Sequence, residues 1–137
     1  MLTIVLLTEN ALTNHDVQRV AHLHDPEPVR IHVVIPMHVD DDQDQATAET
    51  VAKADLAASL ALLKAAGVGD VDGETTVEHP VDAVVARTRQ IGADEVIVLT
   101  EPHLIADLTR RDWATRLRHS LDLPLLHVVS GTDQVVS

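Results

Sequence analysis

Hydrophobic positions along this chain alternate between two spacings. Short, mostly apolar runs with the length of strands cover residues 3–7, 29–35, 95–100 and 125–129, and a run of alternating polarity covers residues 74–78. Between them, apolar residues recur every three or four positions over residues 15–24, 46–66 and 81–91, and again after residue 109. Continuous apolar strands are typical of a parallel sheet covered on both faces. Five strands alternating with four helices predict an α/β fold: a single open five-stranded parallel sheet, doubly wound and Rossmann-like, with four main helices.

Local signals set the expected ends of these helices. Asn14 is the expected N-cap of the first helix. Pro80 is the expected first residue of the third helix, because its fixed φ suits the first turn, and Gly92 is expected to end that helix. Thr109 is the expected N-cap of the fourth helix, with Asp112 at the reciprocal position of a capping box.

The composition conflicts with several classes of function. The formal charge is −12, from 22 acidic and 10 basic residues among 137, and such a surface opposes binding to nucleic acid or to anionic lipid. Without cysteine there are no disulfides, thiol nucleophiles or zinc–thiolate sites. No apolar run reaches the roughly 18 residues that span a membrane, and the first residues lack the features of a signal peptide. We therefore expect a cytoplasmic protein, folded as one domain over residues 1–137, that binds neither nucleic acid nor membranes.

Three segments carry a resemblance to a known family. They are Ala65-Ala66-Gly67-Val68 at the end of the long alanine-rich helix, Gly92-Ala93-Asp94-Glu95-Val96-Ile97-Val98, and Leu123-Pro124-Leu125-Leu126-His127-Val128-Val129. In these segments and in the order of its elements the chain resembles the universal stress protein family, whose fold is similar to that of the adenine-nucleotide α-hydrolases. The resemblance implies a binding or regulatory module of a stress or dormancy response. It also implies a homodimer through Leu125 to Val129, which agrees with the need to cover an apolar edge strand.

The chain departs from the nucleotide-binding pattern of that family in two places. Family members that bind nucleotide place an aspartate after the first strand, where this chain has Thr8-Glu9-Asn10. They also carry a Gly-x2-Gly-x9-Gly-Ser/Thr run after the fourth strand, whereas Thr100 to Ser120 contains no glycine. A loop that cradles phosphate needs glycine so that backbone N–H groups can approach the anion. The chain is therefore most similar to the subset of the family that lacks this run, and we expect no ATP binding through a glycine loop.

Five residues are the candidates for a nucleotide site of a different design. In this alternative the chain is an AMP- or ATP-binding stress sensor that uses Thr8, Glu9, Thr100, Arg110 and Arg111 in place of the glycine run. The two arginines, near the start of the fourth helix, would grip phosphate through bidentate hydrogen bonds. The simpler interpretation is that both arginines are exposed and pair with surface acids, because runs of charge are usually solvated.

The nine histidines do not form a metal-binding pattern. The closest pairs, His22-x-His24 and His38-x-Asp40, are two positions apart and would not share a helix face. We therefore expect structural or surface roles and no metal site. His127 lies in the last strand, where burial would make it resist protonation.

No catalytic residue can be assigned from local motifs. The chain lacks a Gly-x-Ser-x-Gly elbow, a Walker loop and a His-Glu-x-x-His helix. We expect a binding module rather than an enzyme, with a hydrolase or transferase of a related α/β family as the more distant alternative. Trp113, the only aromatic residue other than histidine, forms a stripe with Leu117 and Leu121 that we expect to pack on the sheet. The acidic run from Asp40 to Asp44 is expected to be a solvated loop, and a protein partner remains unspecified.

Overall fold

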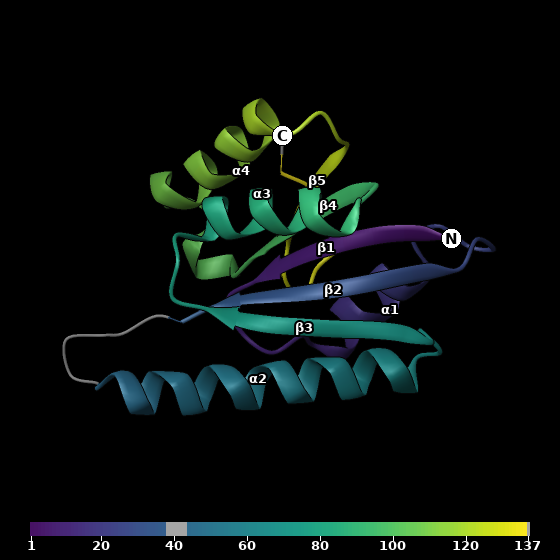
Figure 1. Cartoon of the computed structure of the whole chain (residues 1–137), viewed down its shortest axis with the longest axis horizontal. Helices are drawn as coiled ribbons and strands as arrows, with labels where there is room; N and C mark the ends of the chain where they lie inside the picture. The colour runs from purple at the N-terminus through teal and green to yellow at the C-terminus, as the bar shows by residue number, and fades with distance from the viewer. Residues whose placement is uncertain (38–43, 137) are drawn as a thin grey trace.

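A computed structural model describes residues 1–37 and 44–136 of the chain. Five strands form one parallel sheet in the order β3-β2-β1-β4-β5 (Figure 1). The strands are β1 (Leu2–Thr8), β2 (Val29–Pro36), β3 (Asp70–Thr76), β4 (Glu95–Thr100) and β5 (Leu125–Val129). The helices are α1 (Asn14–His22), α2 (Gln45–Ala65), α3 (Pro80–Ile91) and α4 (Leu108–Ser120), with a short 3₁₀ turn η1 (Pro102–Leu104) before α4. The predicted doubly wound α/β fold is confirmed.

Both faces of β1 and β4 are buried, which explains why these two strands are almost wholly apolar. On β1, Ile4 and Leu6 face one side of the sheet, where they join the core packed by α1 and α2. Val5 and Leu7 face the other side and join the core packed by α3 and α4. Figure 1 shows the two helix layers on opposite sides of the sheet. Successive side chains of β1 therefore point in turn into one core and the other, and none of these four faces water.

Strand β3 runs from Asp70 to Thr76, whereas the sequence predicted residues 74–78. It therefore starts four residues earlier and ends two residues earlier than predicted. Its register with β2 runs from Arg30 opposite Asp70 to Pro36 opposite Thr76. The prediction missed its first half because that half is polar. An edge strand tolerates exposed polar residues such as Asp70 and Asp72, and the backbone pairing of β3 with β2 holds it in the sheet.

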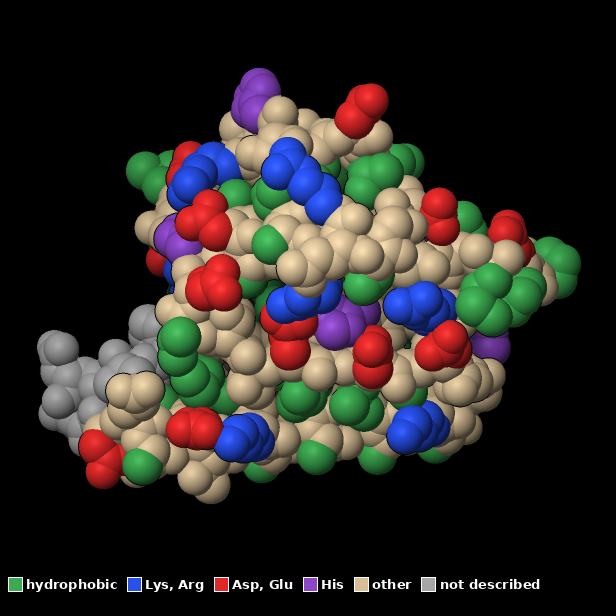
Figure 2. Space-filling view, viewed as in Figure 1, with side chains coloured by type: hydrophobic (Ala, Val, Ile, Leu, Met, Phe, Trp, Pro, Cys, Tyr) green, Lys and Arg blue, Asp and Glu red, His purple; other side chains and the backbone are tan. Residues whose placement is uncertain are grey.

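A polar network covers the face of β2 and β3 beside α3. His32 is 7% exposed, and its two ring nitrogens lie 2.7 Å from Asp72 Oδ1 and 2.8 Å from Glu74 Oε2. Arg87 of α3 donates a 2.7 Å hydrogen bond to Glu74 Oε1. Burial opposes the charged form of Glu74, but hydrogen bonds from Arg87 and His32 outweigh it, so the pKa of Glu74 is lowered. Figure 2 shows a histidine beside basic and acidic side chains between α3 and β3.

Two predicted helix caps are wrong by one or two residues. Thr13, not Asn14, caps α1, and it forms a capping box with Asp16. Asp107, not Thr109, caps α4, since the Thr109 amide donates to Asp107 Oδ1 at 2.8 Å. In both cases a neighbouring residue also has a side-chain oxygen suited to the cap, and the path of the incoming loop selects between them.

The other helix signals agree with the structure. Pro80 is the first residue of α3, and Gly92 ends that helix in the left-handed conformation at φ 66°. Asp44, the last residue of the predicted acidic loop, caps α2, and residues 40–43 of that loop lie outside the described residues. Over residues 1–37 and 44–136, no helix is long and apolar enough to cross a membrane.

Candidate ligand-binding crevice

The sheet order places a topological switch point between β1 and β4. From β1 the chain adds β2 and β3 on one side, and then returns to add β4 and β5 on the other. In open α/β sheets, ligands bind at the carboxyl ends of the two strands beside such a point. Here β1 ends at Thr8 and β4 ends at Thr100, and Glu9 follows β1 directly. Three of the five predicted site residues therefore lie at this crevice.

Two contacts join the segment after β1 to the segments after β4. The Asn10 side-chain amide donates a 3.0 Å hydrogen bond to Glu101 Oε1. The Arg110 guanidinium, from α4, lies 2.6 Å from Glu9 Oε1. The side chains of Glu9 and Arg110 are only 16% and 15% exposed. The structure thus brings the predicted site residues Glu9 and Arg110 together, but they bind each other and not a ligand.

Arg110 also stacks on the tryptophan. Its guanidinium carbon lies 4.4 Å from the centre of the Trp113 ring, and the edge of His79 approaches the same ring at 6.1 Å between centroids. Glu9, His79, Arg110 and Trp113 form what we call the crevice cluster. The prediction that Arg110 is exposed is wrong, because Glu9 and Trp113 cover it, although its predicted pairing with an acid is found. Trp113 packs with the buried Leu117 and the partly buried Leu121 against the sheet, as predicted.

Three polar atoms of the crevice cluster are buried without a hydrogen-bond partner. Over the described part of the chain, Glu9 Oε2, Arg110 Nε and Trp113 Nε1 find none. A buried polar atom without a partner destabilises the folded protein by roughly 1–3 kcal/mol. The cluster therefore has one unused acceptor and two unused donors.

The two threonines of the predicted site are already engaged. Thr8 donates its hydroxyl to the Asn10 carbonyl at 3.0 Å, and Thr100 Oγ1 lies 2.6 Å from His127 Nε2. Both threonines are 3% exposed or less. Arg111 points elsewhere: it is exposed and donates from Nε to the Ile105 carbonyl at 3.3 Å. Arg110 and Arg111 therefore do not form a single clamp.

Two of the exposed or partly buried histidines pair with carboxylates, and His127 is buried. His22 pairs with Asp25 and His24 with Glu95, each at 2.8 Å. His127 is 1% exposed, and burial together with the nearby charge of Arg118 lowers its pKa, as expected for a buried histidine. Within the described ranges, no group of three or more metal-ligating side chains occurs. The predicted pair His38-x-Asp40 lies outside those ranges.

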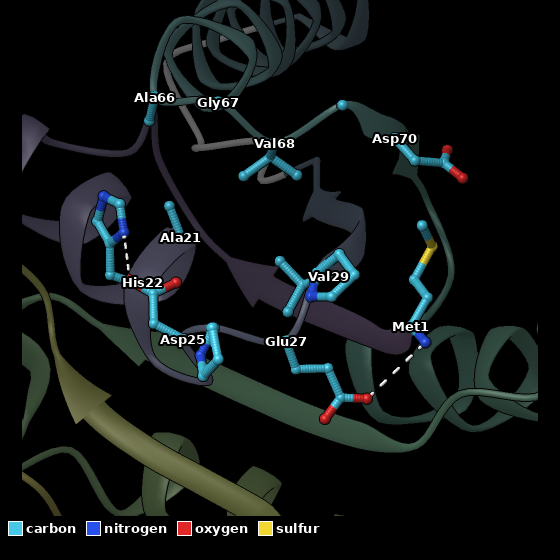
Figure 3. Close-up of a pocket in the computed structure, with 13 residues that line it drawn as sticks. Met1, Ala21, His22, Asp25, Glu27, Val29, Ala66, Gly67, Val68 and Asp70 are labelled. Carbon is cyan, nitrogen blue, oxygen red and sulfur yellow. Dashed lines mark hydrogen bonds and ion pairs between the residues drawn. The ribbon is translucent and has the colours of Figure 1, made fainter.

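A separate cavity of about 500 Å³ opens at the amino ends of β2 and β3 (Figure 3). Val29 and Val68 form part of its apolar wall, and the loops of Asp25 to Pro28 and Gly67 to Gly69 surround it. It lies at the end of the sheet opposite the switch point, where ligands of open α/β sheets are not expected.

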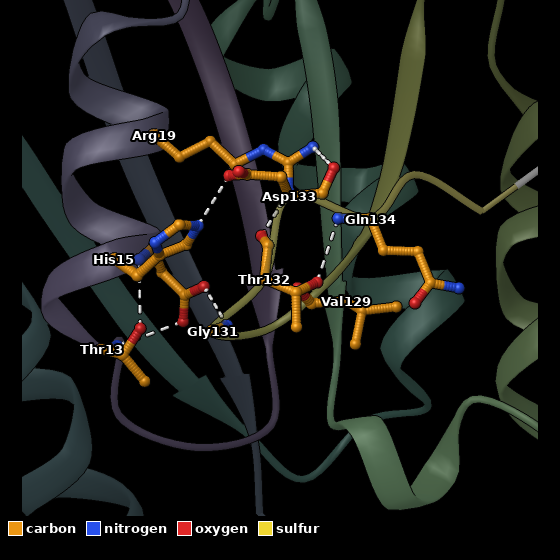
Figure 4. A network of polar contacts seen from close by, with 9 residues as sticks. Thr13, His15, Arg19, Val129, Gly131, Thr132, Asp133 and Gln134 are labelled. Carbon is orange, nitrogen blue, oxygen red and sulfur yellow. Dashed lines mark hydrogen bonds and ion pairs between the residues drawn. The ribbon is translucent and has the colours of Figure 1, made fainter.

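The C-terminal segment is bound to the start of α1 (Figure 4). The buried Asp16 carboxylate accepts hydrogen bonds from Ser130 Oγ at 2.6 Å and from the Gly131 amide at 2.8 Å. Arg19 donates to the carbonyls of Thr132 and Asp133, and His15 Nε2 lies 2.8 Å from Asp133 Oδ1. Sequence reasoning missed this network, because its partners are more than 100 residues apart.

The same segment covers the outer edge of β5. The Val129 amide donates to the Gln134 carbonyl at 3.1 Å, and the Val136 amide donates to the His127 carbonyl at 2.7 Å. Val128 and Val135 form an antiparallel bridge. β5 is an edge strand, as predicted, but its free edge is covered by residues 134–136 of the same chain.

The arrangement of the whole chain is similar to that of solved universal stress proteins. One from Archaeoglobus fulgidus, in complex with dAMP, aligns with a TM-score of 0.65 and 15% identity over 93% of this chain and 97% of that one. The chain has the universal stress protein fold. A universal stress protein in complex with cAMP aligns with a TM-score of 0.63 and 20% identity, over 95% of this chain and 98% of that one. One from Arabidopsis thaliana with AMP bound aligns at 0.60 and 10% identity, over 97% and 94%.

Comparison of the sequence alone does not detect this similarity. No protein-family model matches the chain, and no curated protein matches it either. Identities of 10–20% to the structural neighbours show a shared universal stress protein fold. Whether this chain binds a ligand must be argued from its own residues.

Proposed function

We propose that this chain is a universal-stress-protein-like binding or regulatory module that does not hold ATP through a glycine loop. The observation that carries the proposal is the Glu9–Arg110 ion pair, which crosses the crevice at the switch point. Arg110 is held from a second side by Trp113, so the pair is a packed part of the fold. Glu9 comes from the loop after β1 and Arg110 from the first turn of α4, so the pair joins the two sides of the switch point.

Three physical terms oppose nucleotide binding at this place. A phosphate that takes Arg110 must separate it from Glu9, which costs on the order of 1–3 kcal/mol if the carboxylate stays covered. The backbone offers no compensating cradle, because no glycine occurs between Gly92 and Gly131. The charge of Glu9 would also repel a phosphate brought close to it.

Nucleotide binding is the second candidate, and two observations favour it. Three neighbours of the same fold were solved in complex with dAMP, cAMP and AMP. The crevice cluster also has the unpartnered atoms Glu9 Oε2, Arg110 Nε and Trp113 Nε1, which a polar ligand could satisfy. In this candidate Arg110 turns from Glu9 to a phosphate, and Thr8, Thr100 and Arg111 contribute only after local rearrangement.

Titration of the full chain with ATP and with AMP, in the presence of Mg²⁺, separates the two candidates. Trp113 is the only tryptophan and lies in the crevice cluster, so its fluorescence reports binding there, and calorimetry provides an independent check. The proposal predicts no saturable signal up to about 1 mM nucleotide. A Kd of about 1 mM corresponds to a binding free energy of about −4 kcal/mol. Micromolar binding would overturn it.

A pair of variants locates any binding that is found. Arg110→Gln removes the charge in the crevice, and Arg89→Gln removes a matched exposed charge on α3. The second candidate predicts that Arg110→Gln weakens AMP binding and that Arg89→Gln does not. Glu9→Gln, which removes the competing carboxylate, is expected to strengthen it.

The homodimer through Leu125 to Val129 remains a proposal that rests on the family resemblance. The hydrogen bonds between β5 and residues 134–136 oppose it, because a second copy would have to displace that segment. Light scattering on the purified chain measures the mass directly. A mass of about 15 kDa at micromolar concentration would contradict the dimer. Cytoplasmic location and an unspecified protein partner also remain predictions.

A further inference from the structure

A second cavity, of about 470 Å³, lies between α4, β5 and the C-terminal segment. Arg111, Thr115 and Arg118 line it from α4, and His127 lines it from β5. Gln134, Val135 and Val136 line it from the C-terminal segment, and Ile105 and Ala114 complete the wall. We call it the tail cavity. Its volume is in the range of sites for small organic molecules.

The charge of the tail cavity is opposite to that of the protein. The chain has a formal charge of −12, yet among residues 1–37 and 44–136 no aspartate or glutamate lines this cavity. Arg111 and Arg118 both line it, and among the described residues neither forms an ion pair with an acid. In a strongly acidic protein, two guanidinium groups that share a cavity and lack acidic partners leave a local positive site.

A buried imidazole also borders this cavity. His127 is 1% exposed, and its Nε2 lies 2.6 Å from Thr100 Oγ1, which leaves Nδ1 as the ring nitrogen available to the cavity. When Thr100 donates its hydroxyl proton to Nε2, the neutral ring carries its proton on Nδ1. His127 then presents an N–H donor, in addition to those of the two arginines.

The wall opposite α4 is held in place by hydrogen bonds. Residues 134–136 pair with β5 through the Val129 and Val136 amides. The preceding turn is bound to α1 by Asp16 and Arg19 (Figure 4). The C-terminal wall of the cavity is therefore held in place before a ligand binds, so binding would lose little conformational entropy there.

We propose that the tail cavity binds a small organic anion, a carboxylate or a phosphate monoester with a short apolar chain. The guanidinium groups of Arg111 and Arg118 hold the anionic oxygens, with the His127 N–H as a further donor. The carbon chain of the ligand lies against Ile105, Ala114 and Val136. This site is separate from the crevice cluster, since Arg110 points to Glu9 while Arg111 points to the tail cavity.

The test is calorimetric titration of the full chain at low ionic strength with four probes. Acetate and inorganic phosphate carry the anionic group alone, while hexanoate and n-butyl phosphate add a carbon chain of a few atoms. We expect hexanoate or n-butyl phosphate to bind at least about tenfold more tightly than its short counterpart, because the chain buries apolar surface. The comparison of hexanoate with n-butyl phosphate distinguishes carboxylates from phosphate monoesters.

Two matched variants test the place of binding. Arg118→Gln removes one guanidinium of the tail cavity and should raise the Kd about tenfold. Arg89→Gln removes an exposed charge of α3 outside the tail cavity and should leave the Kd unchanged. The proposal is overturned if no probe binds at about 10 mM, a limit near 3 kcal/mol of binding free energy, or if Arg118→Gln and Arg89→Gln behave alike.

Discussion

Replacing Asp16 by asparagine should destabilise the protein and loosen its C-terminal segment. Asp16 is 1% exposed, and its two oxygens divide three donors between them. Oδ2 accepts from the Thr13 amide at 3.1 Å and from Ser130 Oγ at 2.6 Å, while Oδ1 accepts from the Gly131 amide at 2.8 Å. An asparagine has the same shape but only one oxygen, so it cannot accept at both positions.

The expected loss follows from which donor is left without an acceptor. If the asparagine oxygen keeps Thr13 and Ser130, its NH₂ group faces the Gly131 amide, and two donors then oppose each other. A hydrogen bond to a charged group contributes about 1.5–3 kcal/mol, and an unsatisfied buried donor adds to the loss. We therefore expect Asp16→Asn to lower the free energy of unfolding by about 3 kcal/mol, or the Tm by roughly 10 °C for a domain of this size.

Urea unfolding followed by circular dichroism measures this change, with Asp112→Asn as the control. Asp112 is exposed on α4, so its substitution should change stability by less than about 0.5 kcal/mol. Hydrogen exchange gives a local readout, because the Val136 amide bonds to the His127 carbonyl only while the C-terminal segment stays in place. An Asp16→Asn protein as stable as the control, with unchanged exchange at Val136, would refute the reasoning.

Two further predictions concern the sheet. A Cβ on Gly73 would lie 2.6 Å from Leu56 Cδ1 and 2.7 Å from the Val33 carbonyl oxygen, so Gly73→Ala should lower stability by about 1–3 kcal/mol. Gly69→Ala, with open space around its Cβ, is the control, and equal urea midpoints would contradict the crowding. Because the folded-state pKa of His127 is lowered from 6.5, the unfolded chain takes up its proton first, and stability should fall as pH drops below about 6.5. His127→Gln should weaken that dependence relative to wild type, and identical pH profiles would argue against it.

The sequence determined the fold through short-range patterns. Apolar runs predicted β1, β2, β4 and β5, because strands that are largely buried on both faces carry few polar residues. The same rule explains the partial miss at β3, whose first half is polar because it lies at an edge of the sheet, where Asp70 and Asp72 are exposed. Helix ends were predicted where only one residue fitted, as at Pro80 and Gly92, and misplaced where two neighbouring residues could cap.

The tertiary structure decided what the candidate site residues contact. Glu9 and Arg110 were both predicted as ligand residues, but they are 101 positions apart, and only the sheet order brings them together. Arg110 and Arg111 are adjacent in sequence, yet a helix turns about 100° per residue, so they serve different surfaces. The position of residues 134–136 along the edge of β5 likewise depends on the hydrogen bonds between α1 and the turn at residues 130–133. Local spacing encodes secondary structure, whereas pairings across the crevice and along the β5 edge follow from the order in which the strands assemble.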